Sequence, residues 1–414
     1  MMIFLYIDPG TGSMLFAALI GAMGTLLFFL RKVLLRLKFY LSGGQSAEKN
    51  GDKITYLIFS DSKRYWNVFK PVCDRFEELG IPAEYWTMSE DDPAFSENYS
   101  CVKCTYIGSG NRAYARLNLA SASICLATTP GLEVYQWKRS RDIDWYVHIY
   151  HMMDEGTTYR MFGLDFYDAV LLTGPIQERY IRILEEKRGL KPKELYMTGC
   201  TYMDALDQKV RAYRLTKKEE KSETKIITVL VAPSWGPAGI LSKFGAEFID
   251  ALLKTKFHIV IRPHPQSVES EKAMLERLTE RYAGNDRIEW NYDNDNFEVL
   301  NRSDVLISDF SGVLFDFALA LEKPVIYADT TFDPAIYDAA WIDEPLWKFT
   351  VLDKLGVRLN KEGFGELQPL ILGLLGQSVL EEGRKQVCKE AWQYRGQAAE
   401  RTVDYLIRKA EEMK

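Results

Sequence analysis

Short apolar runs alternate with longer amphipathic segments along most of the chain. Strand-like runs lie at 54–59, 83–87, 102–107, 124–127, 145–150 and 169–172, and helix-like segments such as 66–79 separate several of them. The pattern restarts with a strand at 226–231, a helix near 240–253, a strand at 258–261 and a helix over 269–282. This alternation predicts right-handed βαβ units around mostly parallel sheets. We therefore expect an α/β fold with two similar halves.

Two polar stretches divide this pattern. Residues 42–52 (SGGQSAEKNGD) are Gly-rich and predict a linker, and residues 217–225 (KKEEKSETK) are nearly all charged. We expect one domain over 53–216, a second over 226–380, and a long charged terminal helix filling 381–414. Two such domains face each other across a cleft at the carboxyl ends of their strands, where ligands usually bind.

The first 41 residues (1–41) follow a different pattern. Residues 13–30 carry no charge, and a basic amphipathic segment follows them directly, with Arg31, Lys32, Arg36 and Lys38. The apolar run predicts a membrane-spanning helix, and the basic segment predicts contact with an anionic leaflet. By the positive-inside rule the N-terminus lies outside and the large domains lie in the cytoplasm. A buried core helix and a secreted, anchored protein remain alternatives.

Composition narrows the partners further. The chain has 414 residues, a net charge of -6 and a pI near 5.6, which argues against nucleic-acid binding. Its six cysteines fit no disulfide framework, and the single C-x-x-C of Cys101 and Cys104 has no second pair to complete a metal site. No His cluster occurs either, so we expect neither a metal nor a cofactor.

Two of the four histidines directly follow strand-like runs. His151 comes after the run at 145–150, and His264 comes after the run at 258–261. Residues at such positions reach the cleft of a doubly wound sheet. An imidazole suits a general base because its ordinary pKa lies near neutrality. A hydrogen-bonded structural role is the alternative for His151, whereas His148 and His258 lie inside strands and are expected to pack.

The loops around these two histidines add further candidates. A polar loop with Asp154, Glu155 and Gly156 follows His151; either acid is a candidate to orient the imidazole, and Gly156 is a candidate substrate contact. His264 lies in the sequence Arg262-Pro263-His264-Pro265, in which the prolines restrict the backbone. A rigid His beside Arg262 suits phosphate binding, and a stiff turn is the alternative.

A third loop separates a buried strand from an apolar helix within residues 306–327. Asp309 stands at the strand end, and Ser311 and Gly312 precede the helix. The first N–H groups of a helix lack intrahelical partners and favour anions, so Ser311 and Gly312 predict a pyrophosphate seat, with Ser311 also capping the helix. Asp316, one turn into the helix, is a candidate to accept a hydroxyl. The loop matches neither a Walker A nor a dinucleotide motif.

These loops together resemble the CDP-glycerol glycerophosphotransferase family of teichoic-acid-type primases and polymerases. The resemblance is carried by Pro233-Ser234-Trp235, the loop from Arg262 to Pro265, the turn from Gly199 to Asp204, and the stretch from Ser303 to Tyr327 with Asp309, Ser311, Gly312, Asp316, Lys323 and Pro324. It covers roughly residues 145–330. Met152, Gly236, Phe310 and Gly312 depart from the family pattern.

The resemblance implies a GT-B fold, with two Rossmann-type domains. It implies a transferase that moves glycerol phosphate from a CDP-activated donor to a hydroxyl of a lipid-linked or polymer acceptor at the membrane. His151 corresponds to the base, and Ser234, Trp235, Arg262, His264 and Ser311 are expected around the donor. A glycosyltransferase that uses a nucleotide sugar and a non-catalytic scaffold of the same fold remain alternatives.

Overall fold

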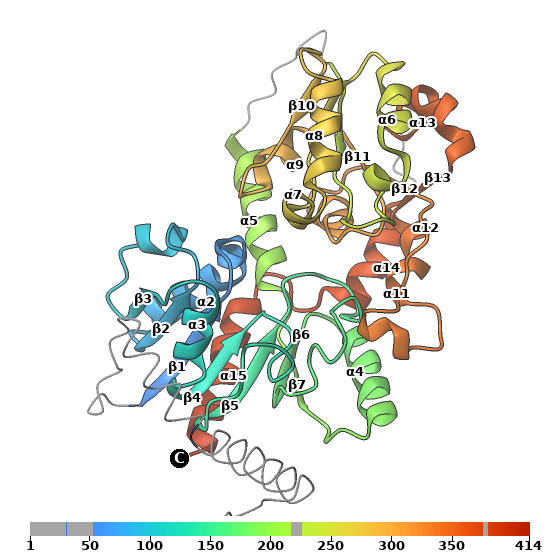
Figure 1. Cartoon of the computed structure of the whole chain (residues 1–414). Coiled ribbons are helices and arrows are strands. Elements are labelled where there is room, and N and C mark those ends of the chain that lie inside the picture. Colours follow the sequence, from blue (N-terminus) through green and yellow to red (C-terminus); the bar gives the residue numbers. More distant parts are fainter. Residues whose placement is uncertain (1–29, 31–52, 217–225, 376–379) are drawn as a thin grey trace, which may run out of the picture.

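The computed structural model of the protein describes residue 30 and residues 53–216, 226–375 and 380–414. The predicted linkers at 42–52 and 217–225, and all of the predicted membrane segment except Leu30, lie outside these residues. Throughout the described ranges, no helix combines the length and the apolar character needed to cross a bilayer. Figure 1 shows two α/β lobes, each built on one parallel sheet, as the alternating pattern predicts.

The N-terminal lobe contains a seven-stranded sheet in the order β3-β2-β1-β4-β5-β6-β7, with all pairs parallel. Its strands are β1 (Ile54–Ser60), β2 (Ala83–Thr87), β3 (Val102–Tyr106), β4 (Ser121–Ala127), β5 (Asp142–Ile149), β6 (Ala169–Leu172) and β7 (Glu194–Met197). Its helical segments are η1 (Lys63–Tyr65), α2 (Trp66–Glu78), η2 (Pro93–Ser96), α3 (Gly110–Leu117), α4 (Pro175–Arg188) and α5 (Thr201–Thr216). The sequence pattern predicted every strand of this lobe except β7.

The C-terminal lobe contains a six-stranded parallel sheet in the order β10-β9-β8-β11-β12-β13. Its strands are β8 (Thr228–Val231), β9 (His258–Ile261), β10 (Ile288–Trp290), β11 (Val305–Ser308), β12 (Val325–Ala328) and β13 (Gly356–Leu359). Its helical segments are α6 (Ile240–Leu253), α7 (Pro265–Ser270), α8 (Lys272–Arg281), α9 (Phe297–Arg302), α10 (Val313–Phe315), the π-helical η3 (Asp316–Ala320), η4 (Asp338–Trp341), α11 (Trp347–Thr350), α12 (Leu352–Leu355), η5 (Lys361–Glu366) and α13 (Leu367–Leu375). The helix predicted over 269–282 is two helices, α7 and α8, which meet at Glu271.

Both faces of each sheet are buried, which explains why the strands read as continuous apolar runs. In β1, Tyr56 and Ile58 enter one core with α2 and the chain's last helix, whereas Leu57 and Phe59 enter another core with α3. Alternate residues of a strand point to opposite faces, so a strand covered on both sides needs apolar residues at every position. The C-terminal sheet is covered on both faces in the same way.

The chain end is a correction to the sequence prediction. The single helix expected within 381–414 is two helices, α14 (Glu381–Ala391) and α15 (Ala398–Glu412). Between them the backbone turns through positive φ at Tyr394 and Gly396. The break lets α15 pack on α2, where Val403 and Tyr405 are fully buried, so the last helix lies on the lobe that contains β1 (Figure 1).

A segment of the C-terminal lobe holds the N-terminal lobe in place. The Nζ of Lys348 in α11 lies 3.2 Å from Oδ2 of Asp154, and both side chains are almost fully buried. The hydroxyl of Tyr180, on α4, accepts the backbone N–H of Trp347 at 2.9 Å. Arg188 of α4 forms an ion pair with Asp338 at 2.6 Å. These contacts fix the loop that follows His151 against the opposite lobe.

Candidate active site between the lobes

Strand order brings three loops of the N-terminal lobe together. Because β1, β4 and β5 are neighbours in a parallel sheet, the residues after them share one edge. Those residues are the turn at 61–64, Thr128 and His151. This edge is the place at which the sequence predicted His151 to emerge.

His151 is half-buried and held from two sides. Its Nδ1 lies 2.8 Å from Oγ1 of Thr128, and its ring lies 4.7 Å, centroid to centroid, from the ring of Tyr65. The pKa of His151 is lowered to about 4, mainly because the imidazole is buried; Asp154 opposes this shift and Arg64 adds to it. The imidazole is therefore neutral at pH 7 and able to accept a proton.

Asp154 and Glu155 do not orient His151, contrary to the prediction. Asp154 accepts from the backbone N–H of Gly156 at 2.9 Å and pairs with Lys348, and Glu155 accepts from the backbone N–H of Lys348 at 3.1 Å. Both carboxylates serve the contact between the lobes, and the side chain that hydrogen-bonds to His151 is that of Thr128.

Gly156 has a structural explanation. It is buried at a φ of +78°, and a Cβ placed there would lie 2.4 Å from the hydroxyl oxygen of Tyr150. Only glycine fits this left-handed position beside the Tyr150 ring. The structure thus gives Gly156 a packing role, and a substrate contact at this residue stays a prediction.

Asp309 organises the carboxyl edge of the C-terminal lobe. Its buried carboxylate accepts backbone N–H groups from Ser234 at 2.8 Å, from Ile240 at 3.0 Å and from Phe310 at 2.7 Å. Burial raises the pKa of Asp309, and these hydrogen bonds oppose that shift. Both carboxylate oxygens of Asp309 are therefore occupied, and they position the start of α6 and the loop that carries Ser234 and Trp235. The side chains of Ser234 and Trp235 are half-buried.

The Ser311–Gly312 turn faces the N-terminal lobe. A Cβ placed on Gly312 would lie 3.8 Å from the Cβ of Met152, the residue after His151. The helical stretch begins with α10 and continues as η3, and Gly312 occupies the N-cap position without a side-chain cap. The prediction that Ser311 caps the helix is therefore wrong, while the turn does lie beside the loop of His151.

His264 and Arg262 differ in what they offer. Nδ1 of His264 accepts the backbone N–H of Gln266 at 3.1 Å. Burial, aided by the charge of Arg64, lowers the pKa of His264 to about 4. A neutral imidazole with an accepting Nδ1 carries its proton on Nε2, which makes His264 a hydrogen-bond donor. The guanidinium of Arg262 donates to the carbonyl of Asp293 at 2.8 Å and also contacts Asn291.

Asp316 lies in a network that joins the lobes. Its Oδ2 accepts the hydroxyl of Tyr202, on α5, at 2.6 Å, and the same hydroxyl accepts from Nδ2 of Asn296 at 2.9 Å. Asp316 is buried, and burial raises its pKa to about 7 against the opposing hydrogen bonds from Tyr202 and Asn296. Near neutral pH this carboxyl changes charge in the contact between the lobes.

Replacing Asp316 by asparagine is expected to change how stability depends on pH. The folded pKa of about 7 exceeds the ordinary value of 3.8, so the carboxyl favours folding below pH 4, and this contribution is lost as pH rises to 7. Relative to wild type, Asp316→Asn should therefore gain free energy of unfolding by about 1.4 kcal/mol per pH unit over this window. Urea unfolding of both proteins from pH 4 to 8 measures this difference in free energy of unfolding. A difference that does not change with pH would contradict the prediction.

Arg64 is a site residue that sequence reasoning missed. Its side chain is exposed, its Nε donates to Oγ of Ser62 at 3.1 Å, and it acts electrostatically on His151 of its own lobe and His264 of the other. The neighbouring Lys63 turns away to pair with Asp91. Within the described ranges, no carboxylate lies within ion-pair distance of Arg64, which leaves a cation facing both histidines. The only sequence signal was its position just after β1.

In the part of the chain that the structure describes, no group of three or more His, Cys, Asp or Glu side chains is arranged to hold a metal ion.

Comparisons with known proteins agree with this architecture. A structure of the wall teichoic acid polymerase TagF matches with a TM-score of 0.57 and 14% identity, covering 93% of this chain and 98% of that one. UDP-GlcNAc 2-epimerase from Methanocaldococcus jannaschii, in complex with UDP-GlcNAc and UDP, matches with a TM-score of 0.54 and 14% identity, covering 86% and 100%. Identities this low establish a shared fold alone. A search of curated protein sequences finds no match.

The fold and the paired carboxyl-edge loops define a GT-B-like, two-lobed α/β protein. The model of one family, CDP-Glycerol:Poly(glycerophosphate) glycerophosphotransferase, matches residues 164–340, which span the end of the first lobe and much of the second. Over these residues the match bears out the resemblance to that family of transferases.

Proposed function

We propose that this protein transfers glycerol phosphate, or a similar polyol phosphate, from a CDP-activated donor to a hydroxyl of a lipid-linked or polymer acceptor. Residues 53–216 would serve the acceptor, and residues 226–380 would hold the donor. A TagF variant soaked with CDPG shares this fold at a TM-score of 0.56 and 13% identity, which is compatible with such a donor.

One observation carries the proposal. The loop of His151 lies against the Ser311–Gly312 turn, since a Cβ placed on Gly312 would lie only 3.8 Å from the Cβ of Met152. A base from one lobe therefore lies beside a turn of the other lobe that has backbone N–H groups to offer an anion. This is the arrangement that transfer from a diphosphate donor requires.

The reaction needs one proton acceptor and one phosphate cradle. With Nδ1 protonated and donating to Thr128, Nε2 of His151 takes the proton of the acceptor hydroxyl. The acceptor oxygen bonds to the β-phosphorus, the bond from that phosphorus to the bridging oxygen breaks, and CMP leaves with the electron pair. Nε2–H of His264, the guanidinium of Arg64 and the N–H groups after Ser311 stabilise the charge that develops on the phosphate oxygens.

A transfer assay with a panel of donors tests the proposal. Purified protein, a synthetic lipid-linked polyol acceptor and CDP-glycerol, CDP-ribitol or UDP-sugars are incubated, and products are resolved by mass spectrometry. We expect a polyol phosphate to be added to the acceptor and CMP to be released. Sugar transfer from a UDP donor would contradict this and favour the glycosyltransferase alternative; binding of no nucleotide would favour a scaffold.

We also propose that residues 13–30 anchor the enzyme in the cell membrane, with the N-terminus outside and the two lobes in the cytoplasm. The support is the uncharged run followed directly by Arg31 and Lys32. In whole cells, an impermeant thiol reagent should label a cysteine introduced at residue 2 and leave one introduced in the second lobe unlabelled. Labelling of the second lobe would refute this topology.

A further inference from the structure

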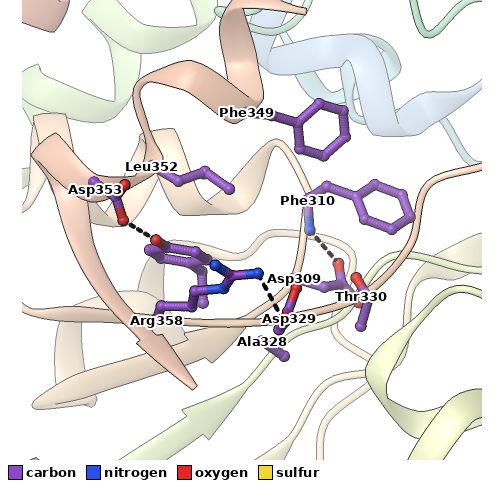
Figure 2. Close-up of a pocket in the computed structure, with 10 residues that line it drawn as sticks. Asp309, Phe310, Ala328, Asp329, Thr330, Phe349, Leu352, Asp353 and Arg358 are labelled. Carbon is purple, nitrogen blue, oxygen red and sulfur yellow. Dashed lines mark hydrogen bonds and ion pairs between the residues drawn. The ribbon is translucent and has the colours of Figure 1, made fainter. Parts of the chain in front are cut away.

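A cavity of about 270 Å³ lies at the carboxyl ends of β11 and β12, beside the Ser311–Gly312 turn. Its lining is shown in Figure 2 and consists of Asp309, Phe310, Tyr327, Ala328, Asp329, Thr330, Phe349, Leu352, Asp353 and Arg358. Phe310 directly precedes Ser311, and neighbouring strands lie about 5 Å apart, so one extended small molecule can reach both places. The proposed reaction leaves this cavity without a role.

Two carboxylates of the lining each keep an oxygen that a ligand can reach. Oδ2 of Asp329 pairs with Arg358 at 2.7 Å, and Oδ1 of Asp353 accepts the hydroxyl of Tyr327. Among the described residues, the second oxygen of each carboxylate has no hydrogen-bond partner, and the Asp329 side chain is 45% exposed. Two accepting oxygens are thus available to a ligand that donates hydrogen bonds.

Two aromatic rings and one aliphatic side chain form the main apolar part of the lining. The rings of Phe310 and Phe349 lie 6.2 Å apart, centroid to centroid, and Figure 2 shows them across the cavity from Asp353 and Arg358. Ring faces and the Leu352 side chain suit the C–H groups of a short carbon chain. The lining holds three aspartates, Asp309, Asp329 and Asp353, against one arginine, Arg358, and this excess of acidic groups disfavours a phosphate in the cavity. The cavity therefore suits an uncharged ligand rich in hydroxyl groups.

We propose that this cavity binds a vicinal diol of the nucleotide donor, with Asp329 and Asp353 accepting its hydroxyl groups while the adjacent turn holds the diphosphate. The inference rests on the proposed function, because it takes the donor to be CDP-activated. A CDP-polyol carries such a diol in two places, in the ribose and at the polyol end. Arg358 acts as a positioning residue that orients the Asp329 carboxylate.

Calorimetric titration of the full chain with Asp329→Asn and Asp353→Asn tests the assignment. Asp250→Asn is a matched control, because Asp250 also pairs with an arginine at 2.7 Å, accepts a tyrosine hydroxyl at 2.7 Å and is 45% exposed, yet lies outside the cavity. The probes are CDP-glycerol, CDP and 2′-deoxy-CDP. We expect each cavity variant to bind CDP-glycerol about tenfold to a hundredfold more weakly than wild type, with Asp250→Asn unchanged.

The probes identify which diol is bound. Weaker binding of CDP-glycerol with unchanged binding of CDP assigns the polyol diol. Weaker binding of both, with 2′-deoxy-CDP insensitive to the substitutions, assigns the ribose diol. Equal affinities of Asp329→Asn, Asp353→Asn and Asp250→Asn for every probe would overturn the proposal.

The two proposals fail in different ways. If wild type transfers glycerol phosphate and the cavity variants bind donor normally, the diol site is wrong and the proposed function stands. Wild type could instead transfer nothing from CDP-glycerol and yet bind a UDP-sugar. If Asp329→Asn then binds that UDP-sugar at least tenfold more weakly than wild type does, the proposed function is wrong and the diol site stands. If wild type binds no diol-bearing nucleotide, both are contradicted.

Discussion

Replacing His151 by alanine is expected to lower kcat for polyol phosphate transfer by about 10²–10⁴-fold, while CDP-glycerol still binds with nearly its wild-type affinity. The imidazole is neutral because burial lowers its pKa to about 4, and Thr128 holds it at 2.8 Å, so its loss removes the proton acceptor and little else. Initial rates of CMP release and calorimetric titration with CDP-glycerol measure the two quantities.

A second histidine provides the control for this experiment. His258 is the first residue of β9, so it lies at the end of that strand away from the cleft, and its side chain is 3.5 Å from Glu289. His258→Ala should keep wild-type turnover. Unchanged turnover in His151→Ala would eliminate His151 as the base, and equal losses in both variants would show that the effect is not specific to the site.

The pH profile adds an independent test of the same group. A base with a pKa of about 4 is available at neutral pH, so kcat/KM should stay level from pH 8 to 6 and fall only below that. The charged or titratable groups that act on His151 are Asp154, which raises its pKa, and Arg64, which lowers it, while His148 is its titratable neighbour.

Removing the Arg64 cation should move that profile. Arg64→Ala raises the pKa of His151, so the acidic fall in kcat/KM shifts to higher pH, and it also lowers kcat because a contact to the developing phosphate charge is lost. Lys63→Ala, which removes the neighbouring cation paired with Asp91, should do neither. An unshifted profile in Arg64→Ala would place its guanidinium away from the reacting groups.

His264 should separate stability from catalysis. His264→Asn keeps a side-chain oxygen that can accept the N–H of Gln266 and so cap α7, but it loses the Nε2–H donor. We expect kcat to fall about 10²–10³-fold with little change in the free energy of unfolding. His264→Ala should lose the same activity and, in addition, about 1 kcal/mol of stability from the missing cap.

Steady-state kinetics and urea unfolding of the two variants check this expectation. If His264→Asn retains full activity while His264→Ala loses it, the histidine acts only as a helix cap. That outcome would remove His264 from the phosphate cradle and leave Arg64 and the backbone of the Ser311–Gly312 turn as its described members.

The two-sheet architecture was predictable because the apolar runs that form its strands can be recognised within short stretches of sequence. Strands buried on both faces must be apolar throughout, as Tyr56 to Phe59 are, and such runs can be recognised without knowing their neighbours. The terminal helix was mispredicted because no proline marks its break, and an isolated glycine such as Gly396 does not by itself end a helical pattern. The break reflects the packing of α15 on α2, a contact between residues more than 300 positions apart in the chain.

The site was predictable only where it depends on position along one strand. His151, His264 and the Ser311–Gly312 turn each follow a strand, so their place at the carboxyl edge could be inferred. Thr128 and Arg64 join them because β1, β4 and β5 are neighbours in space, and sequence alone does not order strands. Asp309 could not be seen as a loop anchor, since its partners lie 69 and 75 residues away.

A crystal structure of His151→Ala with CDP-glycerol bound tests the central claim most directly. We predict diphosphate oxygens at the backbone N–H groups that follow Ser311 and at Nε2 of His264, with the β-phosphorus facing the position vacated by the His151 ring. A nucleotide bound away from the contact between Gly312 and Met152, with its diphosphate touching neither lobe's loops, would contradict the account.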